Sequence, residues 1–360
     1  TGSAGTLFGG KQPAVADGFP SLADAEHLHR VVVAGVDVTG LASGFSFNVV
    51  TNTLDEAEPG AFGDPSAWAT YDPGANGVGT DPDIRQIEVD GVPVNFLQWG
   101  DPGDPGLLFI HGGAAHAHWW SHVAPAFLSR YSAVAIDLSG HGDSAHRDEY
   151  SLDGWCDEVV AVIDAAELRQ PPVLVGHSMG GFVTAATAAR HPDRIAGAVI
   201  IDSPIKEMDP EVEAARAGTQ FANPKIYDDP EIAIAKFRVV PEQDILLPYI
   251  AEHIARRSLK RVPEGWTWKF DKRVFIPRRR EAAEFLAAIR CRVALLRAEH
   301  GLVTRDIGAY MYDQLGRVAP VVELPTAGHH PMLDVPLILI TAIRSLLADW
   351  EHSIPYRRRH

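Results

Sequence analysis

The residue with the clearest chemical signature in this 360-residue sequence is a serine set between glycines. Ser178 lies at the centre of the segment 173–181 (VLVGHSMGG), which runs from an apolar strand-like stretch into a helix-like one. A strained turn between strand and helix exposes a serine hydroxyl, and glycines on both sides prevent clashes across the bend. Such a hydroxyl becomes a nucleophile only when an imidazole accepts its proton and a carboxylate orients that imidazole. The motif therefore predicts acyl-transfer chemistry that also needs a histidine and an acid.

Three further segments support this interpretation. They are FIHGG at 109–113, DLSGHGDS at 137–144 and AGHHPML at 327–333. With the serine motif between the second and the third, they stand in the order found in the α/β-hydrolase fold, which residues 84–350 resemble. The resemblance implies a mostly parallel, doubly wound α/β sheet with an inserted helical cap. It says little about the substrate, since one fold hosts many activities.

The resemblance also assigns roles. His329 follows Gly328 as the catalytic histidine does in the family, whereas His330 is displaced by one residue, so His329 is the expected base. The backbone N–H groups of Met179 and Gly113 are the implied oxyanion donors. His111 is expected to brace its loop.

The acid is the open member of this triad. Most relatives carry Asp shortly after the seventh strand, where this chain has Gly301 in the run RAEHG. A known alternative places the acid after the sixth strand, and Asp202 follows the apolar run 199–201. Asp202 is the preferred candidate, with Glu299 and Asp306 as alternatives, because geometry and not chain position defines a triad.

Three side chains are expected to line the substrate site. His177 is adjacent to Ser178, and neighbouring side chains on so tight a turn diverge, which favours a wall position. Trp119 follows the FIHGG segment, and Trp268 lies in an alternating aromatic and polar stretch at 266–270 that also fits ordinary packing.

No metal or other cofactor is predicted. His116, His118 and His122 lie close together in sequence, but no cysteine or carboxylate joins them at a metal-ligand spacing. The two cysteines, Cys156 and Cys291, are far apart and predict no disulfide framework.

From residue 84 onward the sequence alternates short apolar runs with helix-like stretches, the pattern of buried parallel strands with helical crossovers. The predicted strands are 84–89, 92–99, 107–110, 133–137, 173–175, 198–201 and 293–296. The predicted helices are 155–168, 181–190 and 337–350.

Two segments break this rhythm. The sequence pattern at 205–290 is mostly helical, which predicts a cap domain inserted into the core. The core is formed by 84–204 and 291–352, and a basic tail, 353–360, follows it. Residues 1–83 hold eleven acidic and two basic residues and are rich in glycine and proline, which predicts a partly ordered extension. Its β-rich islands, 30–38 and 45–51, could pair as a hairpin, and the extension could join two copies of the chain.

The composition argues against a nucleic-acid-binding protein and against a membrane-spanning one. With 32 basic and 47 acidic residues the formal net charge is −15, and no basic footprint for nucleic acid is present. No apolar run is long enough to span a bilayer, and the first residues lack signal-peptide features, which favours a cytoplasmic protein.

The sequence thus predicts a serine hydrolase that cleaves an ester or lactone of a small to medium, largely apolar molecule through an acyl-enzyme on Ser178. Carbon–carbon bond hydrolysis and acyl transfer could use the same triad. Epoxide and haloalkane hydrolysis is disfavoured, because those relatives carry Asp where this chain has Ser178. A different class, a ligand receptor that does not catalyse, stays open because the usual acid is missing.

Overall fold

The computed structural model describes residues 32–33, 36–37, 81–206, 224–243, 247–274 and 279–353, with only the backbone described at 32–33, 36–37 and 279–283. The chain divides into two compact units, Thr1–Tyr71 and Asp72–His360. In the first unit, β1 (Val32–Val33) pairs antiparallel with β2 (Val36–Asp37). The first β-rich island therefore pairs with itself. The second island, 45–51, lies outside the described residues.

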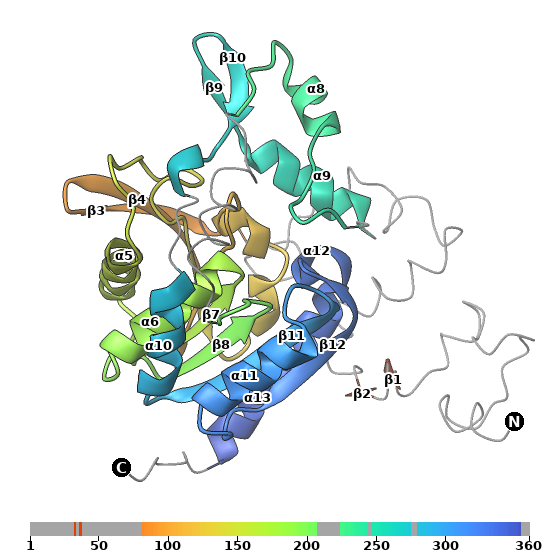
Figure 1. Cartoon of the computed structure of the whole chain (residues 1–360). Coiled ribbons are helices and arrows are strands. Elements are labelled where there is room, and N and C mark those ends of the chain that lie inside the picture. Colours follow the sequence, from red (N-terminus) through yellow and green to blue (C-terminus); the bar gives the residue numbers. More distant parts are fainter. Residues whose placement is uncertain are drawn as a thin grey trace, which may run out of the picture. The chain divides into compact units, whose positions relative to one another are not determined.

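The second unit is built on an eight-stranded sheet in the order β12-β11-β8-β7-β5-β6-β4-β3 (Figure 1). β4 is antiparallel to β3 and to β6, and every other neighbouring pair in this sheet is parallel. The mostly parallel, doubly wound sheet predicted from the sequence is thus confirmed. The strands are β3 (Asp83–Val89), β4 (Val92–Trp99), β5 (Gly106–Ile110), β6 (Ser132–Ile136), β7 (Val173–His177), β8 (Gly197–Ile201), β11 (Arg292–His300) and β12 (Val321–Gly328).

Helices connect and flank these strands. Ser151 begins the first long one by accepting a hydrogen bond from the Gly154 N–H at 2.8 Å, as an N-cap serine does. The α-helices are α5 (Leu152–Ala165), α6 (Met179–Arg190), α8 (Pro230–Ala235), α9 (Pro248–Arg257), α10 (Arg279–Ala288), α11 (Arg305–Gln314), α12 (Pro331–Asp334) and α13 (Pro336–His352). Short 3-10 turns are η3 (Ala117–Trp120), η4 (Ala124–Phe127) and η5 (Lys272–Val274).

Both faces of the sheet are covered. Leu108 and Ile110 of β5 belong to a buried cluster that α5, α6, α10 and α11 complete on one face. Phe109 points to the other face, where its ring lies 5.0 Å from that of Trp120 and 5.9 Å from that of Phe127. Because a parallel strand with helices on both sides has no solvent-facing side, every residue of β5 is buried.

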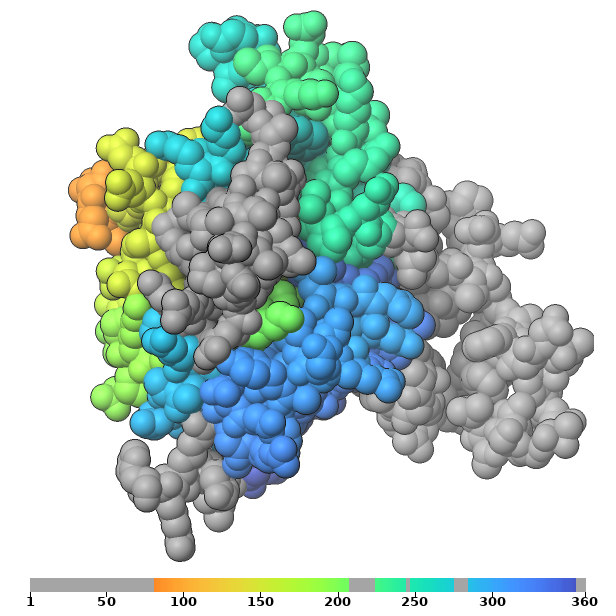
Figure 2. Space-filling model, in the orientation of Figure 1, coloured from red at the N-terminus to blue at the C-terminus, as the bar shows by residue number. Residues whose placement is uncertain are grey.

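The segment predicted as a helical cap is of mixed structure. Beside α8 and α9 it holds an antiparallel hairpin of β9 (Leu259–Val262) and β10 (Gly265–Trp268). The alternation of aromatic and polar residues at 266–268 is the period of a strand, which explains the difference. α10 packs against α6, among the helices that cover the sheet. In the space-filling view, residues of α8, α9 and the hairpin form the upper end of the coloured surface (Figure 2).

Within the described parts of the chain, no helix combines the length and the apolar character needed to cross a bilayer.

Candidate active site

Ser178 occupies a strained turn. β7 ends at His177 and α6 begins at Met179, and the single residue between them has φ 52° and ψ −117°. A positive φ in a residue other than glycine costs on the order of 1 kcal/mol or more, so the surrounding packing must hold it. A Cβ on Gly176 would lie 2.3 Å from the Gly180 carbonyl oxygen, and one on Gly180 would lie 2.3 Å from that of Ile110. This close packing is why the turn needs glycine on both sides.

His329 lies between Ser178 and Asp202. It follows β12 directly, and its ring is buried. Its Nε2 is 3.0 Å from Ser178 Oγ, and its Nδ1 is 2.7 Å from Asp202 Oδ2. With the Nδ1 proton donated to the carboxylate, Nε2 carries the lone pair that can accept the serine proton. The structure thus brings together the three residues that the sequence proposed as nucleophile, base and acid.

Asp202 is completely buried at the end of β8, with φ 41°. Besides the His329 hydrogen bond, its carboxylate accepts from the N–H groups of Leu302 at 2.7 Å, Ala298 at 3.2 Å and Val303 at 3.2 Å. Burial opposes ionisation, but the hydrogen bond from His329 and those from Leu302 and Ala298 outweigh it and hold the pKa of Asp202 below its ordinary value. The carboxylate is therefore ionised throughout the neutral pH range.

The absence of a side chain at Gly301 leaves room for the carboxylate of Asp202. A Cβ at residue 301 would lie 2.2 Å from Asp202 Oδ2, so the missing side chain provides the space that the carboxylate fills. The two alternative acids lie elsewhere. Glu299 is exposed and accepts a hydrogen bond from the Thr326 N–H at 2.7 Å, and Asp306 is exposed and bonds to the Thr304 hydroxyl.

The predicted oxyanion donors flank Ser178. Met179 is the first residue of α6, so its N–H has no acceptor within the helix, whereas the N–H of Ser178 donates to Ile201 O at 3.0 Å. On the other side, a Cβ on Gly112 would lie 3.2 Å from Ser178 Cβ, which places this loop against the nucleophile. The roles of Met179 and Gly113 as donors stay a prediction.

His111 braces the same loop. Its Nδ1–H donates to Gly112 O at 2.7 Å, and its Nε2 accepts from the Leu138 N–H at 3.1 Å. Burial lowers the pKa of His111 to about 4, so the ring is neutral and can accept this bond.

Two more histidines lie beside His329. His177 donates its Nε2–H to His329 O at 2.7 Å, and His330 donates its Nε2–H to Val240 O at 3.2 Å. Burial, and next the neighbouring His329, lower the pKa of His177 to about 3. Burial also lowers the pKa of His330 well below its ordinary value. Both rings are therefore neutral near pH 7.

Trp119 and Trp268, which the sequence analysis placed in the substrate site, differ in their distance from His177, His329 and His330. The Trp119 ring lies 5.4 Å from the His330 ring and 6.5 Å from Phe237. Phe237 in turn lies 6.0 Å from Trp268 of the hairpin. Trp119 is thus next to the histidines, and Trp268 reaches them only through a second aromatic ring.

His116, His118 and His122 each have their own hydrogen-bond partner. His116 Nε2 lies 2.8 Å from Ser258 Oγ, His118 Nδ1 lies 3.0 Å from Ser121 Oγ, and His122 Nε2 lies 2.6 Å from Met332 O. Over the described ranges, the group of side chains close enough to hold a metal ion is a different one, formed by His177, His329 and His330.

Sequence reasoning did not identify Gln243. Its Oε1 accepts from the His330 N–H at 2.9 Å, and its Nε2 donates to Asp334 Oδ2 at 3.2 Å. Asp334 Oδ2 also accepts from the Gly328 N–H at 2.7 Å. Gln243 and Asp334 therefore hold the backbone on both sides of His329. Because Gln243 is far from His330 and Asp334 in the chain, no local sequence pattern could have revealed its contacts.

Replacing Gln243 by alanine should lower kcat about tenfold and leave KM nearly unchanged, because a small displacement of the base weakens proton transfer more than substrate binding. The rate is measured on an activated ester. The matched control is Glu242→Ala at the exposed neighbouring position, which should keep the wild-type rate. A Q243A variant with wild-type kcat and unchanged thermal stability would show that this clamp does not position His329.

Known proteins share this architecture. A family model described as "Alpha/beta hydrolase family" matches residues 107–341. Esterase Rv0045c of Mycobacterium tuberculosis is 24% identical over 278 residues, which cover 74% of this chain and 89% of the esterase. The thioesterase domain from the curacin biosynthetic pathway superposes with a TM-score of 0.63 at 25% identity, covering 73% of this chain and 99% of the domain.

Other matches are partial. Epoxide hydrolase 4 of Mus musculus is 30% identical over 122 residues, which cover 33% of this chain and 34% of that enzyme. The chain thus spans only about a third of this relative's length.

Proposed function

Because this chain belongs to the alpha/beta hydrolase family, we propose that it is a serine hydrolase that cleaves an ester or lactone through an acyl-enzyme on Ser178. One observation carries the proposal: His329 contacts Ser178 Oγ through Nε2 at 3.0 Å and Asp202 through Nδ1 at 2.7 Å. This is the geometry by which an imidazole deprotonates a serine while a carboxylate stabilises the imidazolium that forms.

The reaction follows from this geometry. Ser178 Oγ attacks the substrate carbonyl carbon while its proton passes to His329 Nε2, and the N–H groups of Met179 and Gly113 receive the developing oxyanion. The tetrahedral intermediate then collapses, the bond to the leaving oxygen breaks, and the Nε2 proton goes to that oxygen. Water then gives a proton to His329 Nε2 and attacks the acyl carbon. That proton passes to Ser178 Oγ as the bond between Oγ and the acyl carbon breaks, which releases the acid and restores the serine. Asp202 stays ionised throughout.

An apolar substrate of small to medium size is favoured by the aromatic side chains near the triad. Trp119 lies against His330, and Phe237 links it to Trp268 of the inserted segment. Apolar and aromatic walls with a few polar groups are typical of small-molecule sites. Under this proposal, Trp119 contacts the acyl or alcohol portion, and His177 supports the base rather than the substrate.

Epoxide chemistry is not favoured, although one partial relative is named an epoxide hydrolase. Opening an epoxide in this fold uses an Asp nucleophile, and this chain has Ser178 on the turn. Carbon–carbon hydrolysis and acyl transfer remain the alternatives for the same triad, and a receptor without turnover is the alternative from another class.

A fluorophosphonate probe tests the nucleophile. Ser178 Oγ should displace fluoride from phosphorus, and peptide mass spectrometry should find one adduct on the native protein, at Ser178. Protein denatured by heat beforehand is the control and should stay unlabelled, because the reaction needs the assembled triad. A panel of acetate, butyrate and octanoate esters, a lactone, a thioester and a 1,3-diketone then separates the hydrolytic alternatives. Absence of both labelling and turnover would favour the receptor.

A further inference from the structure

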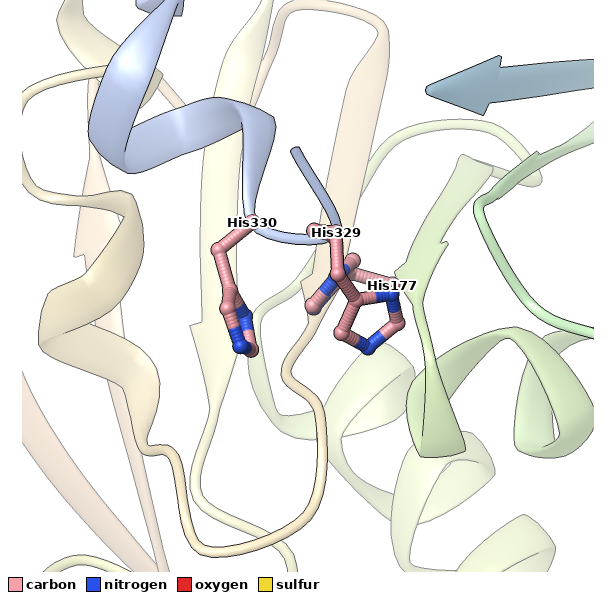
Figure 3. Close-up of side chains that lie close together, drawn as sticks. All are labelled: His177, His329 and His330. Atoms are coloured by element: carbon pink, nitrogen blue, oxygen red, sulfur yellow. The ribbon is translucent and has the colours of Figure 1, made fainter. Parts of the chain in front are cut away.

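The imidazole rings of His177 and His330 lie beside that of His329, the proposed base. His177 comes from the end of β7, and His329 and His330 come from the loop between β12 and α12, so two distant parts of the chain build the cluster (Figure 3). One ring nitrogen from each lies within 4.8 Å of the others. All three side chains are buried, with exposed fractions of 1%, 3% and 5%.

Each ring has one nitrogen already committed as a donor. His177 Nε2–H donates to His329 O, His329 Nδ1–H to Asp202 Oδ2, and His330 Nε2–H to Val240 O. The opposite nitrogen of each ring is therefore unprotonated, and that of His329 accepts from the Ser178 hydroxyl at 3.0 Å. Metal-binding histidines are oriented in this way, by donating their second N–H to a carbonyl or a carboxylate.

His330 supplies the second argument. Its Nδ1 is buried and has no hydrogen-bond partner in the described part of the chain. A buried acceptor without a partner is unfavourable, and a bound cation would satisfy it. Ser178, beside the cluster, is partly exposed, so an ion can approach from the nucleophile side.

We propose that His177, His329 and His330 form an inhibitory site for a divalent transition-metal ion that prefers imidazole, such as Zn²⁺. The ion binds His329 Nε2 in place of the Ser178 hydroxyl. One lone pair cannot both coordinate a metal and accept the serine proton, so the bound form does not turn over. The inhibition rests on the proposed function, whereas the binding does not.

The geometry favours a reversibly bound ion over a resident one. Tetrahedral Zn²⁺ with Zn–N bonds of about 2.1 Å needs ligand nitrogens about 3.4 Å apart. The ligand nitrogens lie up to 4.8 Å apart, so they must move closer by up to about 1.4 Å before they share the ion. This rearrangement works against affinity, and a chelator should restore full activity.

Co²⁺ is the probe, because its visible absorption reports coordination without turnover. The full chain carrying Ser178→Ala should bind Co²⁺ with an absorption band of tetrahedral type, and the added substitution His330→Gln should abolish it. In chains that keep Ser178, H330Q should raise the Zn²⁺ concentration for half-inhibition at least tenfold, relative to each variant's own metal-free rate. His352→Gln, at an exposed histidine near the end of α13, is the matched control and should change neither result.

His177→Asn provides a second, independent removal of a ligand, in case H330Q folds poorly. If the Co²⁺ band and the Zn²⁺ inhibition survive in both ligand variants, the proposed site is wrong. The two proposals fail separately: turnover without Co²⁺ binding overturns the metal site alone, and Co²⁺ binding without turnover overturns only the hydrolase.

Discussion

Replacing Ser178 by alanine should lower kcat on the order of 10⁵-fold or more, because no other group can form the acyl-enzyme. The remaining rate, if measurable, reports oxyanion stabilisation and substrate binding alone. Hydrolysis of the best ester from the panel gives kcat and KM. KM should stay within a few fold of wild type, since the substitution removes only the hydroxyl oxygen.

The control for this variant is Ser151→Ala. Ser151 caps α5 and has no contact with the triad, so its loss should cost about 1 kcal/mol of stability without changing kcat. Circular dichroism and thermal unfolding should show that S178A is folded. Retention of more than a hundredth of the wild-type rate in a folded S178A chain would exclude Ser178 as the nucleophile.

Asp202→Asn should lower kcat about 10⁴-fold, the second largest effect expected. An asparagine can donate to Nδ1, which would place the histidine proton on Nε2, where it cannot accept from Ser178. The substitution also replaces an ionised acceptor that receives N–H groups of Leu302, Ala298 and Val303. Measured by the same assay, near-normal turnover in D202N would remove Asp202 from the triad.

A double variant that exchanges the residues at 202 and 301 tests whether the carboxylate can act from either position. In the variant Asp202→Gly with Gly301→Asp, the carboxylate moves to the position at which the family resemblance first predicts the acid. Glycine accepts the φ of 41° at residue 202, and Gly301 does not have a positive φ, so both backbones suit the new residues. The double variant should be at least tenfold faster than D202G alone. Equal rates would show that the acid cannot act from residue 301.

The sequence indicated the proposed nucleophile and the proposed base because their signals are local. Ser178 stands in a glycine pattern that a strand-to-helix turn requires, and His329 follows a short motif. For the acid, the sequence favoured Asp202 but left Glu299 and Asp306 as alternatives. β8 and β11 are neighbours in the sheet but far apart in sequence, so only the folded chain shows that Asp202 occupies the space beside Gly301.

The strands that were predicted correctly are those in which apolar residues follow one another without a break. Interior strands such as β5 and β8 are buried along their whole length and were found to within a residue. β12 was not predicted: it lies at the sheet edge, is partly exposed and contains Pro325, which an edge strand tolerates. The β9–β10 hairpin was missed because its residues lie in a charged segment that reads as helix.

The exclusion of a side chain at residue 301 by Asp202 also has an evolutionary consequence. A chain can pass from one acid position to the other only through an intermediate with two carboxylates in one space or with none, and both are poor catalysts. We therefore expect hydrolases of this fold to divide into two lineages, each with a carboxylate at one of the two strand ends and a small residue at the other. A sequence search that requires an acid after β11 would miss this chain.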